Sequence, residues 1–354
     1  MGDAVNKTSI EWTDYTTNLI RYRDPEGRSV HGCIKVSAGC ANCYASAWSA
    51  RGLTGERDGA FTAKRQATLT PYFDDAEAQR ILRTRVTGKR VFVGDMTDVF
   101  GEWVPDALLD RMFAVFALRP DLTFQLLTKR PERMREYVNH PWSGFRQREQ
   151  MADISGEAVV TATYPLPNVW LGVSVEDQAA ADERIPALLD TPAAVRFLSC
   201  EPLLERVDLT PVAIPRVWGV CAPRETVRDV VRRFGEPTVD WVIVGGESGP
   251  GARPCDVGWI RDIVGQCRAA EVPVFVKQLG AWGPCQKLPS GVGCFVRAGD
   301  VVLAPDGKAW PVRADLTCEG EGMGAAYRKG VYRDRKGGDM SEWPEDLWVR
   351  EFPS

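Results

Sequence analysis

The sequence is poor in histidine, because His31 and His140 are the only two among 354 residues. Metal sites built mainly from imidazole, and catalysis by a Ser–His or Cys–His pair, are therefore not expected. An excess of positive charge is also lacking, since the formal net charge is −4. The chain thus has no global basic field of the kind that marks many nucleic-acid-binding proteins.

Long apolar runs are absent as well. No stretch reaches the roughly 18 apolar residues that a membrane-spanning helix needs, and residues 1–7 lack the apolar core of a signal peptide. We therefore expect a cytoplasmic protein with no membrane partner. In that reducing compartment its ten cysteines would be thiols or metal ligands rather than disulfides.

Short apolar runs that end in glycine or polar residues recur along the middle of the chain. Runs that are apolar at consecutive positions are typical of strands buried on both faces of a parallel sheet. We predict six such strands, at residues 91–93, 124–127, 169–173, 195–198, 241–244 and 274–276, and a seventh near the cysteines of residues 33–43. Apolar residues at helical spacing follow in residues 106–116, 181–189 and 260–267.

These strand–helix units predict an α/β fold that is a complete or partial parallel (β/α) barrel, with a doubly wound open sheet as the alternative. Both architectures place their active sites at the carboxyl ends of the strands. Residues 1–282 would form the barrel, with insertions at about 137–166, interpreted as a long loop, and at about 211–238. Residues 283–354 carry short β-like runs and are predicted to be a small β-rich C-terminal appendage.

The strongest signal for chemistry is the C-x6-C-x2-C spacing of Cys33, Cys40 and Cys43. Three thiolates in so short a segment can hold one metal centre, but they are one ligand short of a closed zinc or iron–sulfur site. A [4Fe–4S] cluster on three cysteines leaves one iron open, to which S-adenosyl-L-methionine can bind. The alternatives are a zinc site completed by His31 or by a distant Cys or Asp, and three unrelated thiols.

Two resemblances follow from these motifs. Residues 40–45, Cys-Ala-Asn-Cys-Tyr-Ala, with Gly32-Cys33 before them, resemble the cluster segment of spore-photoproduct-lyase-like radical SAM proteins, although the first gap is six residues here and three there. Much of the chain is similar to a phage-associated family of three-Cys-motif proteins of unknown function that are radical-SAM-like. The motifs that carry this similarity lie at residues 9–14, 33–43, 127–131, 170–176, 197–204 and 244–249.

The resemblance implies a radical SAM-type barrel in which Cys33, Cys40 and Cys43 bind a [4Fe–4S] cluster. Reductive cleavage of S-adenosylmethionine, with electrons from a donor, would then yield a radical that abstracts hydrogen from a substrate. In such folds the segment after the next strand receives the amino group of S-adenosylmethionine, and here that segment contains Asp95 and Thr97.

Polar or glycine residues also follow other predicted strands and would converge on one rim of the barrel. They could bind the ribose or carboxylate of S-adenosylmethionine, or the substrate. The alternative is that they cap helices or pair with Lys129, Lys277 or Arg253 in a structural network. These candidate cofactor-binding residues are Ser174, Glu176, Ser199, Glu201, Gly246 and Glu247.

The sequence therefore predicts a radical SAM-type enzyme of unknown substrate. Two basic runs, residues 224–233 and 327–336, together with the phage association, suggest a nucleobase or nucleic acid. The alternative is a zinc-stapled, non-catalytic protein that binds nucleic acid or a host partner.

Overall fold

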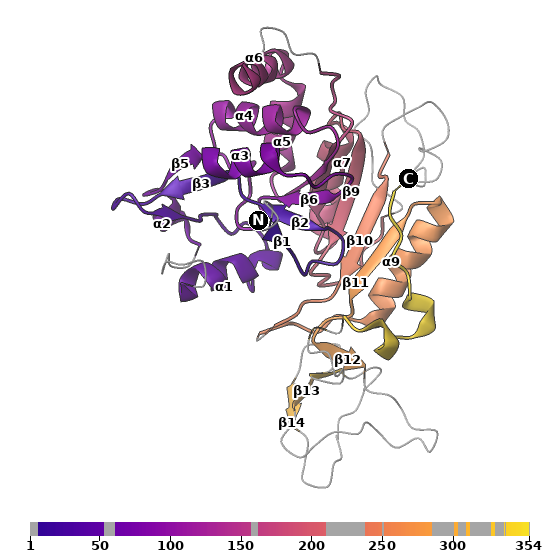
Figure 1. Cartoon of the computed structure of the whole chain (residues 1–354). Helices are drawn as coiled ribbons and strands as arrows, with labels where there is room; N and C mark the ends of the chain where they lie inside the picture. Colours follow the sequence, from indigo (N-terminus) through magenta and orange to yellow (C-terminus); the bar gives the residue numbers. More distant parts are fainter. Residues whose placement is uncertain are drawn as a thin grey trace, which may run out of the picture.

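The computed structural model describes residues 6–52, 61–156, 162–209, 238–249, 251–284, 301–303, 309–311, 327–329, 336 and 338–353. In this part of the chain the fold is mixed α/β, with helices packed around a large parallel-rich sheet (Figure 1).

The central sheet confirms the strands predicted from apolar runs. The first pair of strands is antiparallel and every later pair is parallel. All six predicted strands are present, and the seventh is β2, which precedes the cysteines. The order is β1 (Asn6–Lys7), β2 (Tyr15–Thr17), β6 (Arg90–Val93), β7 (Thr123–Thr128), β8 (Val169–Ser174), β9 (Val195–Cys200), β10 (Trp241–Gly245) and β11 (Val274–Gln278).

The sheet is curled into a half-barrel. Trp12, which precedes β2, lies 4.8 Å from Phe92 on β6 and 6.3 Å from Trp241 on β10, measured between ring centroids. Strand β10 is five strands along from β2 in the sheet order, so in a flat sheet the two would be about 24 Å apart. The predicted barrel is therefore a partial one, and in the described residues no strand joins β11 to β1.

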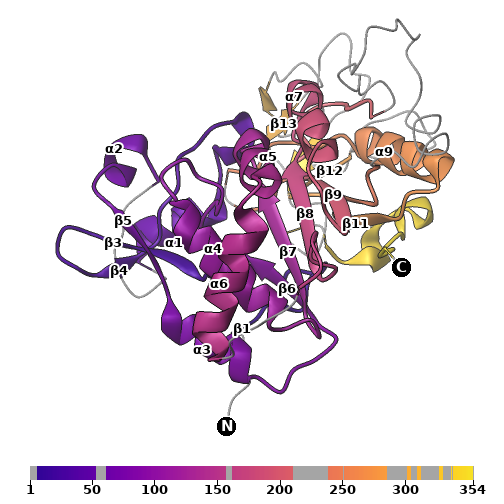
Figure 2. The same cartoon turned by 90° about the horizontal axis from the view of Figure 1, so that it is seen from above.

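Helices cover the outer face of this sheet (Figures 1 and 2). Side chains at alternate strand positions, such as Phe124 and Leu126 on β7, pack with them into the main apolar core. The predicted helical segments are present as α4, α7 and α9. The layer comprises α3 (Asp75–Arg83), α4 (Asp106–Ala117), α5 (Pro131–Asn139), α6 (Ser143–Ser155), α7 (Gln178–Leu189) and α9 (Val257–Ala270).

Helix α6 occupies the segment that the sequence analysis interprets as a long loop, and that interpretation is wrong. Its buried positions are Ser143, Gln147 and Met151, spaced four residues apart. Two of the three are polar, so the face that packs on α4 leaves no apolar periodicity in the sequence. The guanidinium of Arg146 donates to Asp110 of α4 at 2.7 Å. The other predicted insertion, residues 211–238, lies outside the described residues except for residue 238.

The inner face of the half-barrel is filled with aromatic side chains toward the amino ends of the strands. Trp12, Phe92, Phe197, Trp241, Ile243 and Phe275 form one buried cluster there. Bulky side chains at this end are the usual interior packing of parallel barrels. The polar side chains described below lie at the opposite end.

Two smaller sheets flank the half-barrel. One has the order β4 (Ser29–Val30), β3 (Ile20–Arg23) and β5 (Thr70–Phe73). The other agrees with the predicted β-rich appendage and has the order β12 (Trp282–Pro284), β15 (Tyr327–Lys329), β13 (Val301–Leu303) and β14 (Ala309–Pro311).

The last described residues return to the half-barrel (yellow in Figure 1). They contain the short 3-10 helices η2 (Met340–Glu342) and η3 (Glu345–Leu347) and continue beside β11. There the amide of Val276 donates to the carbonyl of Val349 at 2.9 Å. The described part of residues 283–354 therefore contains strands of a small sheet and a segment that packs on the main core.

Candidate functional site at the carboxyl ends of the strands

The cysteine loop, which we define as residues 31–43, passes over the carboxyl ends of the parallel strands. Three side chains that follow different strands donate to its backbone carbonyls. The Thr97 hydroxyl donates to Gly32 at 2.6 Å, the Arg130 guanidinium to Ile34 at 3.0 Å, and the Arg253 guanidinium to Ala38 at 2.9 Å. The loop is thus fixed to the rim after β6, β7 and β10, where the sequence analysis places the site.

The three predicted metal ligands lie on this loop and are all partly exposed. Cys33 and Cys43 pack against one apolar cluster. Cys40 ends the 3-10 helix η1 (Ala38–Cys40), and its sulfur lies 3.8 Å from the Ser37 hydroxyl. Among the described residues, no three or more Cys, His, Asp or Glu side chains are gathered so that they could hold a metal ion.

The pKa of the Cys33 thiol determines whether this residue is a thiolate that can bind a metal. Burial, together with the nearby charges of Asp98 and Cys43, raises the pKa of its thiol to about 12. The thiol is therefore protonated at neutral pH unless a cation replaces its proton. Three sulfur donors beside an apolar wall fit an iron–sulfur or zinc centre in donor chemistry, whereas the positions of the sulfur atoms do not form a closed ligand set.

Glu176, after β8, is a fully buried carboxylate directly under the loop. Its oxygens accept from the Lys129 ammonium at 2.5 Å, from the Arg184 guanidinium at 2.6 Å and from the Ser37 hydroxyl. Burial alone would raise its pKa, but the charges of Lys129 and Arg184 outweigh this and lower the pKa to about 2. A Cβ at Gly39 would lie 2.3 Å from a Glu176 oxygen, so this close approach requires glycine.

Two further predicted carboxylates are also paired. Arg253 holds Glu247 through two guanidinium contacts of 2.7 and 2.9 Å, and the Asn42 amide donates to Glu247 at 3.0 Å. These contacts outweigh burial and lower the pKa of Glu247. Glu201 accepts from Lys277 at 2.5 Å. The three carboxylates therefore form ion pairs with Lys129, Arg253 and Lys277. These are the cations expected in the alternative interpretation, in which the strand-end residues belong to a structural network.

Asp95 differs from these carboxylates. In the described part of the chain no cation pairs with it, and its partner is the Asn18 amide, which donates at 2.6 Å. Burial raises the pKa of Asp95 more than the Asn18 hydrogen bond lowers it. The Tyr44 hydroxyl donates to the Asp95 carbonyl at 2.7 Å, which places Asp95 next to the Cys43 end of the cysteine loop.

The remaining predicted residues divide into two kinds. Ser174 and Ser199 are adjacent in register and buried, and their hydroxyls make no hydrogen bond within the described ranges. The Thr97 hydroxyl, by contrast, donates a hydrogen bond to the Gly32 carbonyl of the cysteine loop. Gly246 serves backbone packing, because a Cβ there would lie 2.5 Å from the carbonyl oxygen of Leu279.

Sequence reasoning missed several residues that build the rim. Ser37 and Asn42 lie inside the cysteine motif, where polar residues next to the ligands were a usable signal. Arg184 lies on α7, and nothing in the sequence indicates that it turns back toward Glu176. Asp98 was not missed, because it follows the same predicted strand as Asp95 and Thr97; it is buried and accepts from the Thr128 hydroxyl at 2.7 Å, which ties the segment after β6 to the end of β7.

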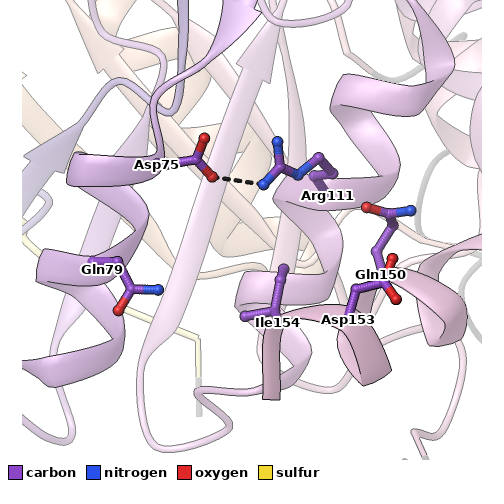
Figure 3. Close-up of a pocket in the computed structure, with 6 residues that line it drawn as sticks. All are labelled: Asp75, Gln79, Arg111, Gln150, Asp153 and Ile154. Atoms are coloured by element: carbon purple, nitrogen blue, oxygen red, sulfur yellow. Dashed lines mark hydrogen bonds and ion pairs between the residues drawn. The ribbon is translucent and has the colours of Figure 1, made fainter. Parts of the chain in front are cut away.

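A separate cleft of about 410 Å³ lies among helices α3, α4 and α6 (Figure 3). An ion pair of 2.6 Å between Asp75 and Arg111 crosses it. Its lining contains none of the predicted site residues, so it does not belong to the rim. The lining residues are Asp75, Gln79, Arg111, Gln150, Asp153 and Ile154.

Comparisons with known proteins place the chain in a family without assigning a reaction. In the described residues no helix is long and apolar enough to cross a membrane. Searches of curated proteins and of solved structures find no match. One family profile, described as "Protein of unknown function (DUF5131)", matches residues 7–337. Because this match covers most of the chain, the protein belongs to the DUF5131 family.

Proposed function

We propose that the protein is a radical SAM-type enzyme that uses a three-cysteine [4Fe–4S] cluster and S-adenosylmethionine. The observation that carries the proposal is a loop with three partly exposed thiols, fixed across the carboxyl ends of a parallel half-barrel. Parallel barrels build their active sites at this end. The sequence resemblance supports the same assignment.

In this proposal Cys33, Cys40 and Cys43 hold the cluster. When bound, the cluster supplies the electron for reductive cleavage of S-adenosylmethionine, and an external donor must deliver that electron. Glu176 and Glu247 keep the loop in place through Ser37 and Asn42, so their role is to position the thiols rather than to contact a ligand.

Asp95 receives the amino group of S-adenosylmethionine. Its carboxyl group is partly buried, has a raised pKa and lacks a cationic partner among the described residues. A bound ammonium would favour its ionised form, because an opposite charge at close range lowers the pKa of a carboxyl group. The hydroxyls of Ser174 and Ser199, which make no hydrogen bond to any described residue, are available to hydrogen-bond the ribose or the substrate.

The substrate class suggested by the sequence is a nucleobase or nucleic acid, in the cytoplasm of a cell or of a phage host. The basic run at 224–233 lies outside the described residues, and of the run at 327–336 the structure describes the backbone of β15 and residue 336. The resemblance to phage-associated proteins supports this part of the proposal.

Anaerobic reconstitution with iron and sulfide tests the proposal. We expect a brown protein with about four irons per chain, the content of one cubane cluster. Cys40→Ala should lose the iron. Cys267→Ala, which removes a buried thiol on α9, is the matched control and should keep it. Equal iron in wild type and Cys40→Ala would refute the assignment.

The ion pairs at the rim favour a second candidate, a zinc-stapled protein without catalytic activity that binds nucleic acid or a host partner. Glu176, Glu201 and Glu247 are already neutralised by protein cations, as a structural network requires. Protein purified without oxygen would then contain one zinc per chain and no visible absorbance.

A further inference from the structure

The half-barrel contains a buried amide that has no hydrogen-bond partner among the described residues. Gln125 on β7 is fully buried, and in the described structure neither its side-chain oxygen nor its nitrogen has a hydrogen-bond partner. Buried polar groups in native proteins are almost always paired, and an exception calls for a water, an ion or a ligand. Gln125 is a neutral donor and acceptor, so a ligand that pairs with it must offer both functions.

The position of Gln125 in its strand directs it to the inner face. Its neighbours Phe124 and Leu126 belong to the outer core, and the Phe124 ring stacks on Phe116 of α4 at 4.2 Å. Successive side chains of a strand point to opposite faces. Gln125 therefore points into the half-barrel, in register with Phe92 on β6 and Trp170 on β8.

Aromatic residues flank this amide on both neighbouring strands, Phe92 on β6 and Trp170 on β8. The Trp12 ring lies 4.8 Å from Phe92, and Trp170 lies 5.9 Å from Trp241. The indole nitrogen of Trp12 is a second buried donor without a hydrogen-bond partner in the described residues. Aromatic walls with two unpaired polar groups suit an uncharged planar ring that carries polar atoms on its edge.

The inner face becomes less bulky toward the rim. At the register level of Ile243 and Phe275 the neighbouring strands carry small side chains, Ser199 on β9 and Ser174 on β8, and Gly245 lies nearer the end of β10. Closed barrels usually fill such positions with branched aliphatic residues. On β7 itself the inner-face residue between Gln125 and the rim is Leu127, which packs on the aromatic cluster, so a ligand that enters from the rim reaches Gln125 only if this side chain turns aside.

We propose that the inner face of the half-barrel binds a nucleobase, with the edge of the base paired to the Gln125 carboxamide and its ring against Phe92 and Trp170. A carboxamide places a donor beside an acceptor and forms two hydrogen bonds to a base edge, as glutamine does with adenine. The inference rests on the proposed function for treating this space as the substrate site, and it names the substrate class. The base comes from a free nucleoside or from a nucleotide turned out of a single strand.

Isothermal titration calorimetry of anaerobically purified protein tests the inference, with and without reconstituted iron. The probes are adenosine, cytidine, guanosine and uridine, and a short single-stranded oligonucleotide. We expect binding of at least one nucleoside or of the oligonucleotide, and the pattern distinguishes the two sources. Gln125→Leu should weaken that binding about 10-fold or more, since two hydrogen bonds are lost.

The matched control is Gln147→Leu. Gln147 is also buried and also has an unpaired side-chain oxygen, but it lies on α6 in the outer layer, so its loss should leave binding unchanged. Gln125→Leu should raise the melting temperature, because it removes an unpaired polar group from the interior. Gln125→Met, an unbranched replacement, repeats the test if the leucine variant does not fold.

Two results would overturn the inference: wild-type protein that binds none of the probes, or Gln125→Leu and Gln125→Met proteins that bind them as wild type does. Iron content, measured on the same samples, reports separately on the proposed function. Binding that depends on Gln125 in a protein that takes up no iron would refute the cluster and leave the nucleobase site standing.

Discussion

Replacement of Glu176 by glutamine gives the most direct test of how the rim is built. The substitution keeps the shape of the side chain but removes the charge that Lys129 and Arg184 share. The difference between the ordinary pKa of 4.5 and the folded value of about 2 corresponds to about 3 kcal/mol. Breaking a buried ion pair on one side costs about 3–5 kcal/mol. We therefore expect Glu176→Gln to lower the free energy of unfolding by about 3 kcal/mol at pH 7.

The pH dependence of the same variant supplies an independent check. Because the pKa of Glu176 is lower in the folded state than in the unfolded state, its stabilisation is present above pH 4.5 and is lost as the pH falls toward about 2. Wild-type protein should lose this contribution across that interval, and Glu176→Gln should lack it. Urea unfolding followed by circular dichroism at several pH values measures both effects.

Glu183→Gln provides the matched control, because Glu183 is exposed on α7 next to Arg184. We expect it to change the free energy of unfolding by less than about 0.5 kcal/mol. If Glu176→Gln were as mild as this control, or kept the acid sensitivity of wild type, Glu176 would not be the buried anchor described above. Faster reaction of the cysteine loop with a thiol reagent in Glu176→Gln would show that the anchor also restrains the thiols.

Three other substitutions test separate parts of the structure. Asp95→Asn should keep the iron but weaken the binding of S-adenosylmethionine about 10- to 100-fold, since a charge-assisted hydrogen bond is lost. Equilibrium dialysis measures this affinity, and an unchanged affinity would show that Asp95 does not bind S-adenosylmethionine. Gly39→Ala should lower both stability and iron content, because its Cβ meets a buried carboxylate, whereas Gly265→Ala on α9, with nothing within 4 Å, should be neutral or stabilising by up to about 1 kcal/mol. Phe352→Ala should cost about 2 kcal/mol in urea unfolding, because its ring packs on Trp241 and Phe275; a cost no larger than that of removing the exposed Trp142 would contradict this packing.

The parallel strands were predictable because both of their faces are largely buried, so most of their residues are apolar at consecutive positions, even where a polar residue such as Gln125 interrupts the run. β2 is an exception, since Tyr15, Thr16 and Thr17 are buried but not strongly apolar, and only its place before the cysteines suggested it. Helix α6 was missed for the same kind of reason. Its contacts with the neighbouring helices use Arg146, which pairs with Asp110 of α4, and Gln147, which donates to Tyr137 of α5, and the apolar spacing of the sequence does not reveal either.

For the candidate site, the sequence predicted where polar residues gather but not how they pair. That Glu176, Glu201 and Glu247 follow strands is visible in the chain. That each meets a cation depends on which strands lie side by side, since Lys129 and Glu176, for example, are 47 positions apart in the sequence. The sequence could not predict either that the Gln125 side chain lacks a hydrogen-bond partner among the described residues, because this depends on which residues face β7 inside the half-barrel.

The anchoring of the cysteine loop has a consequence for metal loading. Contacts at Gly32 and Ile34 flank Cys33, and contacts at Ala38 and Asn42 flank Cys40 and adjoin Cys43. With the backbone held on both sides, a metal centre bound as proposed would bring the sulfur atoms together by side-chain rotation and not by refolding of the loop. Amide hydrogen exchange in residues 31–43 should then be nearly the same before and after a metal centre is loaded.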